Sequence, residues 1–201
     1  NRLALSFDWY NARTKDLLVQ KKYPYISGMG IYWANGGELK NVGLEATVSG
    51  KLINTRNFQW ELGLSLGHYK NEITALDEEI KPTSVYGGEV VTKVGESIGA
   101  FYGYKTDGIF TTAAEAQKAN LCIVDAAGNE SYFKAGDVKF VDMNDDNIIN
   151  DTDKTIIGNP HPDLYGNIFS KFTYKNWQFD ILFNYSLGND AYNYYRQQLE
   201  S

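Results

Sequence analysis

The sequence predicts a mainly β fold whose antiparallel strands belong to a transmembrane β-barrel with long extracellular loops. Three observations carry this prediction: apolar and polar residues alternate with a period of two, the alternating segments run for about nine to eleven residues, and short connections alternate with long ones. Strands usually have about five or six residues. A tilted strand needs about 9–11 residues to cross a bilayer, so these segments have the length of membrane strands.

Five segments show the alternation. In the third of them, Phe58, Trp60 and Leu62 share one face and Gln59 and Glu61 share the other. Successive strand residues point to opposite faces, so each segment has one apolar and one polar face. A large soluble β-sandwich shows the same alternation, and periodicity alone therefore leaves both architectures open. The first segment has its apolar residues at Leu3, Leu5, Phe7 and Trp9, and the others span 44–52, 58–66, 168–174 and 177–187.

The connections between these segments favour the barrel. Residues 53–57 form a short turn between two segments, and Lys175 and Asn176 form a two-residue turn between two others. The remaining connections are long, with about thirty residues in 12–42 and about ninety-five in 71–165. Membrane barrels have short periplasmic turns and long extracellular loops, and a sandwich has no reason to keep this alternation.

The pattern divides the chain into three parts. Residues 1–70 hold barrel strands with one long loop, and residues 166–201 hold a barrel hairpin and the start of the next loop. Residues 71–165 form an extracellular excursion with small β and helical elements and an acidic loop. Unstructured loops of that length are rare, so the excursion is expected to have secondary structure of its own.

Elements inside the long loops can also be placed. Strand-like stretches run from 97 to 110 and from 136 to 142, and the alanine-rich segment 112–120 predicts a short helix. The tail predicts a second helix capped by Asn189 or Asp190, because Asn and Asp accept hydrogen bonds from the first free N–H groups of a helix.

Composition excludes several functions. The net charge of −6 argues against nucleic-acid binding, which needs a basic face. The single cysteine, Cys122, forms no internal disulfide and is predicted to be a packing residue. His68 and His161 have no Ser or Cys partner in a nucleophile motif, and the many acids include no distinctive acid–base pair. The chain is therefore predicted not to be an enzyme.

Residues 142–153 read DMNDDNIINDTD and raise the question of a metal site. The stretch fits the loop of an EF-hand, with Asp142 at the first position and Asp153 at the twelfth. Asn147 takes the sixth position, where Gly is usual and Asn is the next most tolerant of left-handed backbone. Oxygen ligands in this number suit calcium. The candidate ligands are Asp142, Asn144, Asp146, the carbonyl of Ile148, Asn150 and Asp153.

Two departures from the template keep an alternative open. Asp153 is shorter by one methylene than the bidentate Glu that usually stands at position twelve. The segment before the loop, with Val138 and Phe140, has the pattern of a strand and not of a helix. Asp145 and Asp151 fall at positions without a ligand role. The stretch is thus predicted to be a structural calcium loop, and the alternative is a solvated, hydrogen-bonded turn.

Two long stretches carry a family resemblance. GESIGAFYGYKTDGIFTTAAEAQ (95–117) and GDVKFVDMNDDNIINDTDKTIIGNPHPDLYGNIFSKFTYKNWQFDILFNYSLGNDAYNYYR (136–196) closely resemble the C-terminal portion of SusC/RagA-type TonB-linked outer-membrane receptors. TKDLL (14–18) and NGGELKNVGLEATVSGKL (35–52) resemble the barrel of the same family. The likeness covers nearly the whole chain in the correct order.

The resemblance implies a large β-barrel with an N-terminal plug in the outer membrane of a Gram-negative cell. It implies TonB-energised import of oligosaccharides or peptides, with a SusD-like surface lipoprotein, TonB and outer-membrane lipid as partners. The chain is expected to be a fragment that lacks the plug, the TonB box and most of the barrel strands. About five long strands also do not close a barrel. The alternative is a soluble carbohydrate-binding β-sandwich module with a structural calcium site.

Ligand-contacting residues cannot be assigned from the sequence. The first long loop carries aromatic residues that are expected either to stack on sugar rings or to pack against a partner or neighbouring loops. These residues are Tyr23, Tyr25, Tyr32 and Trp33.

Overall fold

The computed structural model describes residues 2–22, 31–77 and 80–200. The chain separates into two compact units. Unit 1 contains residues 1–81, 92–99 and 159–191, and unit 2 contains residues 82–91, 100–158 and 192–201.

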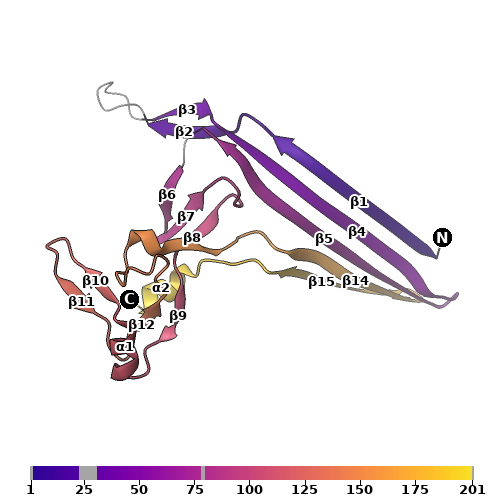
Figure 1. Ribbon diagram of the computed structural model, residues 1–201. Coiled ribbons are helices and arrows are strands. Elements are labelled where there is room, and N and C mark those ends of the chain that lie inside the picture. The colour runs from indigo at the N-terminus through magenta and orange to yellow at the C-terminus, as the bar shows by residue number, and fades with distance from the viewer. Residues whose placement is uncertain (1, 23–30, 78–79, 201) are drawn as a thin grey trace. The chain divides into compact units, whose positions relative to one another are not determined.

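Unit 1 is dominated by one antiparallel sheet of five long strands (Figure 1). Its order is β1-β4-β5-β14-β15, so each of the five predicted segments is a strand and neighbouring segments in the chain pair with each other. β4 and β5, with 18 and 19 residues, extend beyond the predicted segments. The strands are β1 (Leu3–Thr14), β4 (Gly37–Asn54), β5 (Phe58–Leu76), β14 (Leu164–Tyr174) and β15 (Trp177–Leu187).

Both predicted short turns are present. The turn between β4 and β5 is held by Thr55, whose hydroxyl donates to the carbonyl of Phe58 at 2.7 Å and accepts from its N–H at 3.0 Å. Lys175 and Asn176 join β14 to β15, and Lys175 has a φ of 51°, as two-residue hairpin turns require. The long connections therefore leave from the opposite end of the sheet.

Three aromatic side chains lie over glycines of the neighbouring strand. Phe169 pairs with Gly63, and a Cβ placed on Gly63 would overlap the Phe169 ring. Tyr165 covers Gly67 in the same way. Real Cβ atoms do not approach rings so closely, so these positions require glycine. We call these the glycine–aromatic pairs, and the third is Gly43 with Tyr10.

The loop ends of unit 1 are tied by polar contacts. The ring Nδ1 of His161 lies 2.9 Å from the Tyr69 hydroxyl, and its Nε2 lies 3.1 Å from the carbonyl oxygen of Ile98. The Asn71 side chain accepts a hydrogen bond from the N–H of Ile98 at 2.9 Å. His68 Nδ1 lies 2.5 Å from the carbonyl oxygen of Asp163. Both histidines therefore contact loop backbone. A separate hairpin is formed by β2 (Leu18–Lys22) and β3 (Ile31–Asn35).

Unit 2 contains the elements of the long excursion. Its largest sheet has the order β13-β8-β7-β6. Two smaller pairs, β10 with β11 and β9 with β12, lie beside a short helix in the chain. The strands are β6 (Ile80–Val85), β7 (Gly88–Thr92), β8 (Ala100–Tyr104), β9 (Thr106–Ile109), β10 (Cys122–Val124), β11 (Glu130–Tyr132), β12 (Val138–Phe140) and β13 (Lys154–Gly158).

The predicted helix at 112–120 is present as α1 (Ala113–Ala119). Thr112 caps it by accepting from the N–H of Glu115, and Asn120 ends it with a φ of 53°. The helix packs its Ala116 into the core of unit 2, where Phe110 is fully buried. This core consists of Phe110, Ala116, Leu121 and Ile149, with Tyr104, Ala119, Phe133 and Phe140 packed against it. Cys122 is buried, as expected of a packing residue.

The predicted capping of the tail helix is wrong. The helix is α2 (Tyr194–Glu200), and Asn193 accepts from the N–H of Arg196 at its start. Asn189 and Asp190 are occupied elsewhere, because Asn189 accepts from the Ser186 hydroxyl and Asp190 accepts from the backbone N–H of Asn159. Within the described residues, neither helix is long and apolar enough to span a membrane.

Candidate functional site

One face of the five-stranded sheet is an exposed apolar band. Residues paired across the strands point to the same side of a sheet. The central row of this face is apolar on every strand, and its ends, Leu5 and Phe183, expose 76% and 66% of their surface. Burying such a row removes apolar area from water, which favours a nonpolar environment on this side. The row is Leu5, Val48, Leu64, Ile168 and Phe183.

The opposite face is polar. The row next to the central one carries hydroxyl and amide groups on all five strands, namely Ser6, Thr47, Ser65, Asn167 and Asn184. Another row has charges of alternating sign at Lys51, Glu61, Lys171 and Asp180. A shallow groove of about 420 Å³ lies on this face, lined by Glu45, Thr47, Ser65, Tyr165, Asn167 and Asn184 among others.

The acidic loop follows β12 and is folded by its own side chains. The Asp142 carboxylate accepts backbone N–H groups of Asn144 at 3.2 Å, Asp145 at 2.8 Å and Asn147 at 2.6 Å. Burial acts to raise the pKa of Asp142, but these N–H groups outweigh it and hold the pKa below its ordinary value. Asn147 has a φ of 66°, the left-handed backbone that the template requires at its sixth position. The segment before the loop is a strand, as predicted.

Asp153 closes this loop. Its side chain is fully buried. One carboxylate oxygen accepts from the N–H of Met143 at 2.9 Å, and the other accepts from the N–H of Asn150 at 2.8 Å. Asn150 in turn accepts from the N–H of Thr152, which completes a capping box at the short 3-10 turn of residues 151–153. Asp153 therefore links Met143, the second residue of the loop, to Asn150, the ninth.

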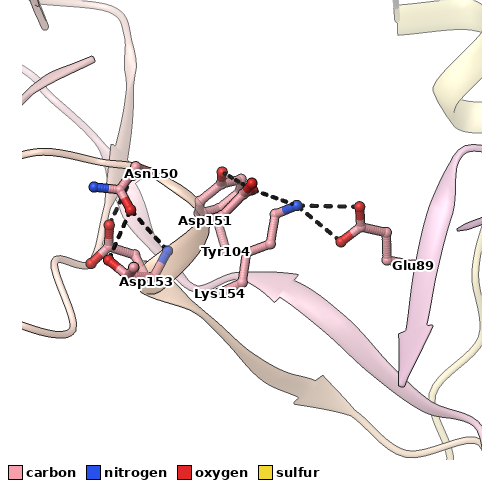
Figure 2. A network of polar contacts seen from close by, with 7 residues as sticks. Glu89, Tyr104, Asn150, Asp151, Asp153 and Lys154 are labelled. Carbon is pink, nitrogen blue, oxygen red and sulfur yellow. Dashed lines mark hydrogen bonds and ion pairs between the residues drawn. The ribbon is translucent and has the colours of Figure 1, made fainter. Parts of the chain in front are cut away.

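Lys154 follows directly and carries an ion-pair network (Figure 2). Its ammonium group lies 3.0 Å from carboxylate oxygens of both Asp151 and Glu89, and 5.4 Å from the centre of the Tyr104 ring. Hydrogen bonds to Asp151 and then Glu89 raise the pKa of Lys154 well above its usual value. The same contact with Lys154 lowers the pKa of Asp151. The network ties β13 to β7 across β8.

Comparison with known proteins identifies relatives of the whole chain. No protein-family model matches it. TonB-dependent receptor P3 of Formosa agariphila is 30% identical over 208 residues, which cover 100% of this chain and 20% of the relative. TonB-dependent receptor SusC of Bacteroides thetaiotaomicron is 29% identical over 203 residues, which cover 95% of this chain and 18% of the relative.

The chain is homologous to TonB-dependent receptors.

The chain spans about a fifth of the length of these receptors. Their identity as receptors agrees with the prediction that this chain is not an enzyme. The fold of this chain also has solved counterparts. The structure of the RagAB peptide importer in its closed-closed state matches 94% of this chain and 20% of that one, with a TM-score of 0.64 and 22% identity. The prediction of antiparallel strands of barrel type is therefore confirmed.

The predicted calcium ligands lie together in one turn, but their oxygens accept hydrogen bonds from other groups of the loop. Asp146 accepts from the N–H of Ile148, and both oxygens of Asp153 accept backbone N–H groups. In the part of the chain that the structure describes, no group of three or more His, Cys, Asp or Glu side chains is placed to hold a metal ion. To bind a cation, the carboxylate oxygens would have to point toward one common centre. Each oxygen still has a second lone pair with which it can do so. Calcium binding stays a prediction.

Titration with calcium tests whether the acidic loop binds the ion. If the loop binds calcium, adding the ion to the purified receptor releases or absorbs heat with a Kd of about a millimolar or tighter and raises the melting temperature. The matched variant Asp142→Asn keeps an oxygen at the first position and removes its charge, so it should weaken this response. Absence of heat and of a thermal shift at millimolar calcium would show that the loop is a hydrogen-bonded turn only.

Replacing Lys154 with Met should destabilise unit 2 by about 1 kcal/mol, because it leaves Glu89 and Asp151 without their cation. The raised pKa of Lys154 means that its contribution is complete below pH 10.5 and is lost as the pH rises through the folded value. The lowered pKa of Asp151 means that its contribution is present above pH 3.8 and is lost on acidification. Thermal unfolding from pH 3 to 11 should therefore show a plateau of stability in wild type that begins to fall at both ends of this range.

The variant should have a flatter pH profile than wild type. Lys134, an exposed lysine of unit 2, provides the control through Lys134→Met. Equal pH profiles for wild type and Lys154→Met would contradict a stabilising role of the network.

Sequence reasoning did not find this network. Glu89 and Lys154 are 65 residues apart, and no motif links them. Of the aromatic residues expected in the first long loop, Tyr32 and Trp33 lie on β3, and Trp33 is exposed. Tyr23 and Tyr25 lie outside the described residues.

Proposed function

We propose that this chain is part of an outer-membrane, TonB-dependent transporter that imports oligosaccharides or peptides. The observation that carries the proposal is homology with TonB-dependent receptors over the whole chain, in a sheet with one apolar and one polar face. A membrane barrel needs this division, because one face meets lipid and the other lines the interior. The location in the outer membrane follows from the same homology.

The dimensions of the apolar face support a membrane position. In β5 the apolar side chains run from Phe58 to Leu66 at every second residue. Nine residues at about 3.3 Å each, tilted by about 40°, cover about 23 Å of bilayer, close to the apolar band of about 25 Å in outer-membrane barrels. Trp177 and Tyr174, at the turn end of this face, expose 80% and 52% of their surface, as aromatic residues at a membrane interface do.

The proposed partners are a SusD-like surface lipoprotein and, through a part of the receptor outside this chain, TonB. SusC and the RagAB peptide importer are the relatives that support this assignment. RagAB imports peptides, and the proposed substrate class of this chain includes both oligosaccharides and peptides.

Uptake and fractionation test the proposal together. The complete receptor should be recovered in the outer-membrane fraction and released only by detergent. Cells with the receptor should take up an oligosaccharide or peptide pool, and deletion of TonB should abolish that uptake. Recovery in the soluble fraction without detergent would defeat the proposal and favour the carbohydrate-binding β-sandwich.

A further inference from the structure

The turn between β6 and β7 holds a tyrosine in an unfavourable backbone conformation. Tyr86 has a φ of 52° and Gly87 a φ of 92°, so both central residues of this two-residue hairpin turn are left-handed. Asn and Gly are the residues that such turns favour, and a bulky aromatic residue there is an outlier. The Tyr86 side chain is 77% exposed, so burial does not offset this cost. The backbone of Tyr86 is strained and its ring is not buried within the protein. This combination indicates that the ring contacts another molecule.

Two further tyrosines are gathered beside this ring. Tyr194 lies with its ring centre 5.7 Å from that of Tyr86, and Tyr195 lies 6.1 Å from Tyr194. Tyr195 is 79% exposed. We call these three residues, Tyr86, Tyr194 and Tyr195, the tyrosine platform. They come from a hairpin turn and from the start of α2, which are more than a hundred residues apart in the chain.

The turn between β6 and β7 makes direct contacts with α2. The Tyr192 hydroxyl donates to the carbonyl of Tyr86 at 3.3 Å and also contacts the Gln197 side chain. A Cβ on Gly87 would lie 2.7 Å from the Gln197 amide, so the helix covers the turn closely. These contacts hold the platform rings in place before any ligand arrives, which reduces the entropy lost on binding.

We propose that the tyrosine platform binds neutral sugar rings of an imported oligosaccharide, an inference that rests on the proposed transport function. A sugar ring offers a C–H face that packs on an aromatic ring and hydroxyls that exchange hydrogen bonds with phenol groups. Tyrosine combines both properties in one rigid side chain. Three exposed tyrosines in a row match a chain of repeating sugar units better than they match a single small molecule.

The same hairpin is poorly suited to peptides. An extended peptide would bind by adding a strand to the outer edge of β6, which is the last strand of its sheet among the described residues. Pro82 lies in β6 and has no backbone N–H, so it interrupts that edge. The acidic residue of β7, Glu89, is already paired with Lys154 and does not offer its charge to a peptide amino group. The platform therefore favours glycans over peptides.

Binding of neutral glycans to the purified complete receptor tests the inference. A glycan array selects the tightest neutral hexasaccharide, and titration then measures its Kd for wild type and variants. Tyr86→Asn removes the ring and places a residue that the turn prefers, so the variant should fold at least as well as wild type. Its Kd should rise about tenfold, the effect of losing one stacked ring. Tyr195→Ala should act in the same direction, and Tyr132→Ala, an exposed tyrosine on β11, should leave the Kd unchanged.

The outcomes separate the platform from the transport proposal. Wild type that binds no neutral glycan, while TonB-dependent peptide uptake persists, would overturn the platform and leave transport intact. Wild-type affinity in both Tyr86→Asn and Tyr195→Ala would also overturn it. A weaker interaction of Tyr86→Asn with the surface lipoprotein, at unchanged glycan affinity, would reassign the platform to protein contact. Absence of TonB-dependent uptake of any substrate would instead defeat the proposed function.

Discussion

Replacing Ile168 with Lys should sharply reduce the amount of receptor that assembles in the outer membrane. Ile168 lies in the central row of the apolar face, halfway along the band. A lysine on the lipid face near the bilayer midplane costs about 2–4 kcal/mol in membrane barrels. The measurement is the fraction of receptor in outer-membrane extracts that keeps the altered gel mobility of a folded barrel without heating.

Asn167 provides the control from the next position of the same strand. It lies in the polar row, and its side chain lines the groove on the other face. Asn167→Lys should therefore assemble close to wild-type levels. If Asn167→Lys is the more damaging of the two, the assignment of the faces is reversed, and if both assemble normally, neither face meets lipid.

Replacing Asp153 with Ala should open the acidic loop. The buried carboxylate accepts the N–H groups of Met143 and Asn150, and its removal leaves both donors without a partner. Hydrogen bonds to a charged group contribute about 1.5–3 kcal/mol each, so we expect a loss of about 3 kcal/mol in local stability. Amide exchange at Met143 and Asn150, measured in calcium-free buffer, should become about a hundredfold faster.

Two further variants complete this test. Asp153→Asn should give an intermediate rate, because its amide oxygen accepts one N–H while its NH₂ group faces the other. Asp145→Asn, at a position whose φ is 60° and therefore tolerates Asn, should exchange as wild type does. Unchanged exchange in Asp153→Ala would show that the capping box is not what closes the loop.

The five long strands were predictable because the alternation of apolar and polar residues is visible in the sequence alone. Phe58 to Leu66 in β5 and Trp177 to Leu187 in β15 each place apolar side chains at every second position. The extensions of β4 and β5 toward Gly37 and Leu76 were not predicted, because Lys40, Lys70 and Glu72 stand there at positions that are apolar along the rest of these strands. On the other face of this extension, the Asn71 side chain donates a hydrogen bond of 2.6 Å to the Asn41 side chain.

The small strands of the excursion were harder to predict. β6 and β7 meet at Tyr86 and Gly87, whereas the usual signal for such a hairpin is Asn-Gly or Asp-Gly. The tail helix was placed too early because two good capping residues, Asn189 and Asp190, are used by other loops. Local signals identify residues that are able to cap or turn, but the three-dimensional structure decides which of them do so.

The acidic stretch 142–153 is one turn folded by its own side chains, but the sequence did not show that its carboxylates accept backbone N–H groups of the loop. The buried state of Asp153 was not predicted. The nearby Ile149 is buried in the core of unit 2, and no pattern in the sequence marks Asp153 as the buried carboxylate. The pairing of Lys154 with Glu89 was also missed. Contacts between residues far apart in the chain produce no periodic pattern in a single sequence.

The glycine–aromatic pairs constrain how sequences of this kind can diverge. A side chain added at Gly63 would collide with the Phe169 ring, and loss of that ring would leave a gap over bare backbone. Viable change therefore requires coordinated replacement at both positions, so 10 with 43, 63 with 169 and 67 with 165 should covary among descendants of a common ancestor. Such covariation, between positions far apart in the chain, would encode the strand order and register of the sheet in sequence data alone.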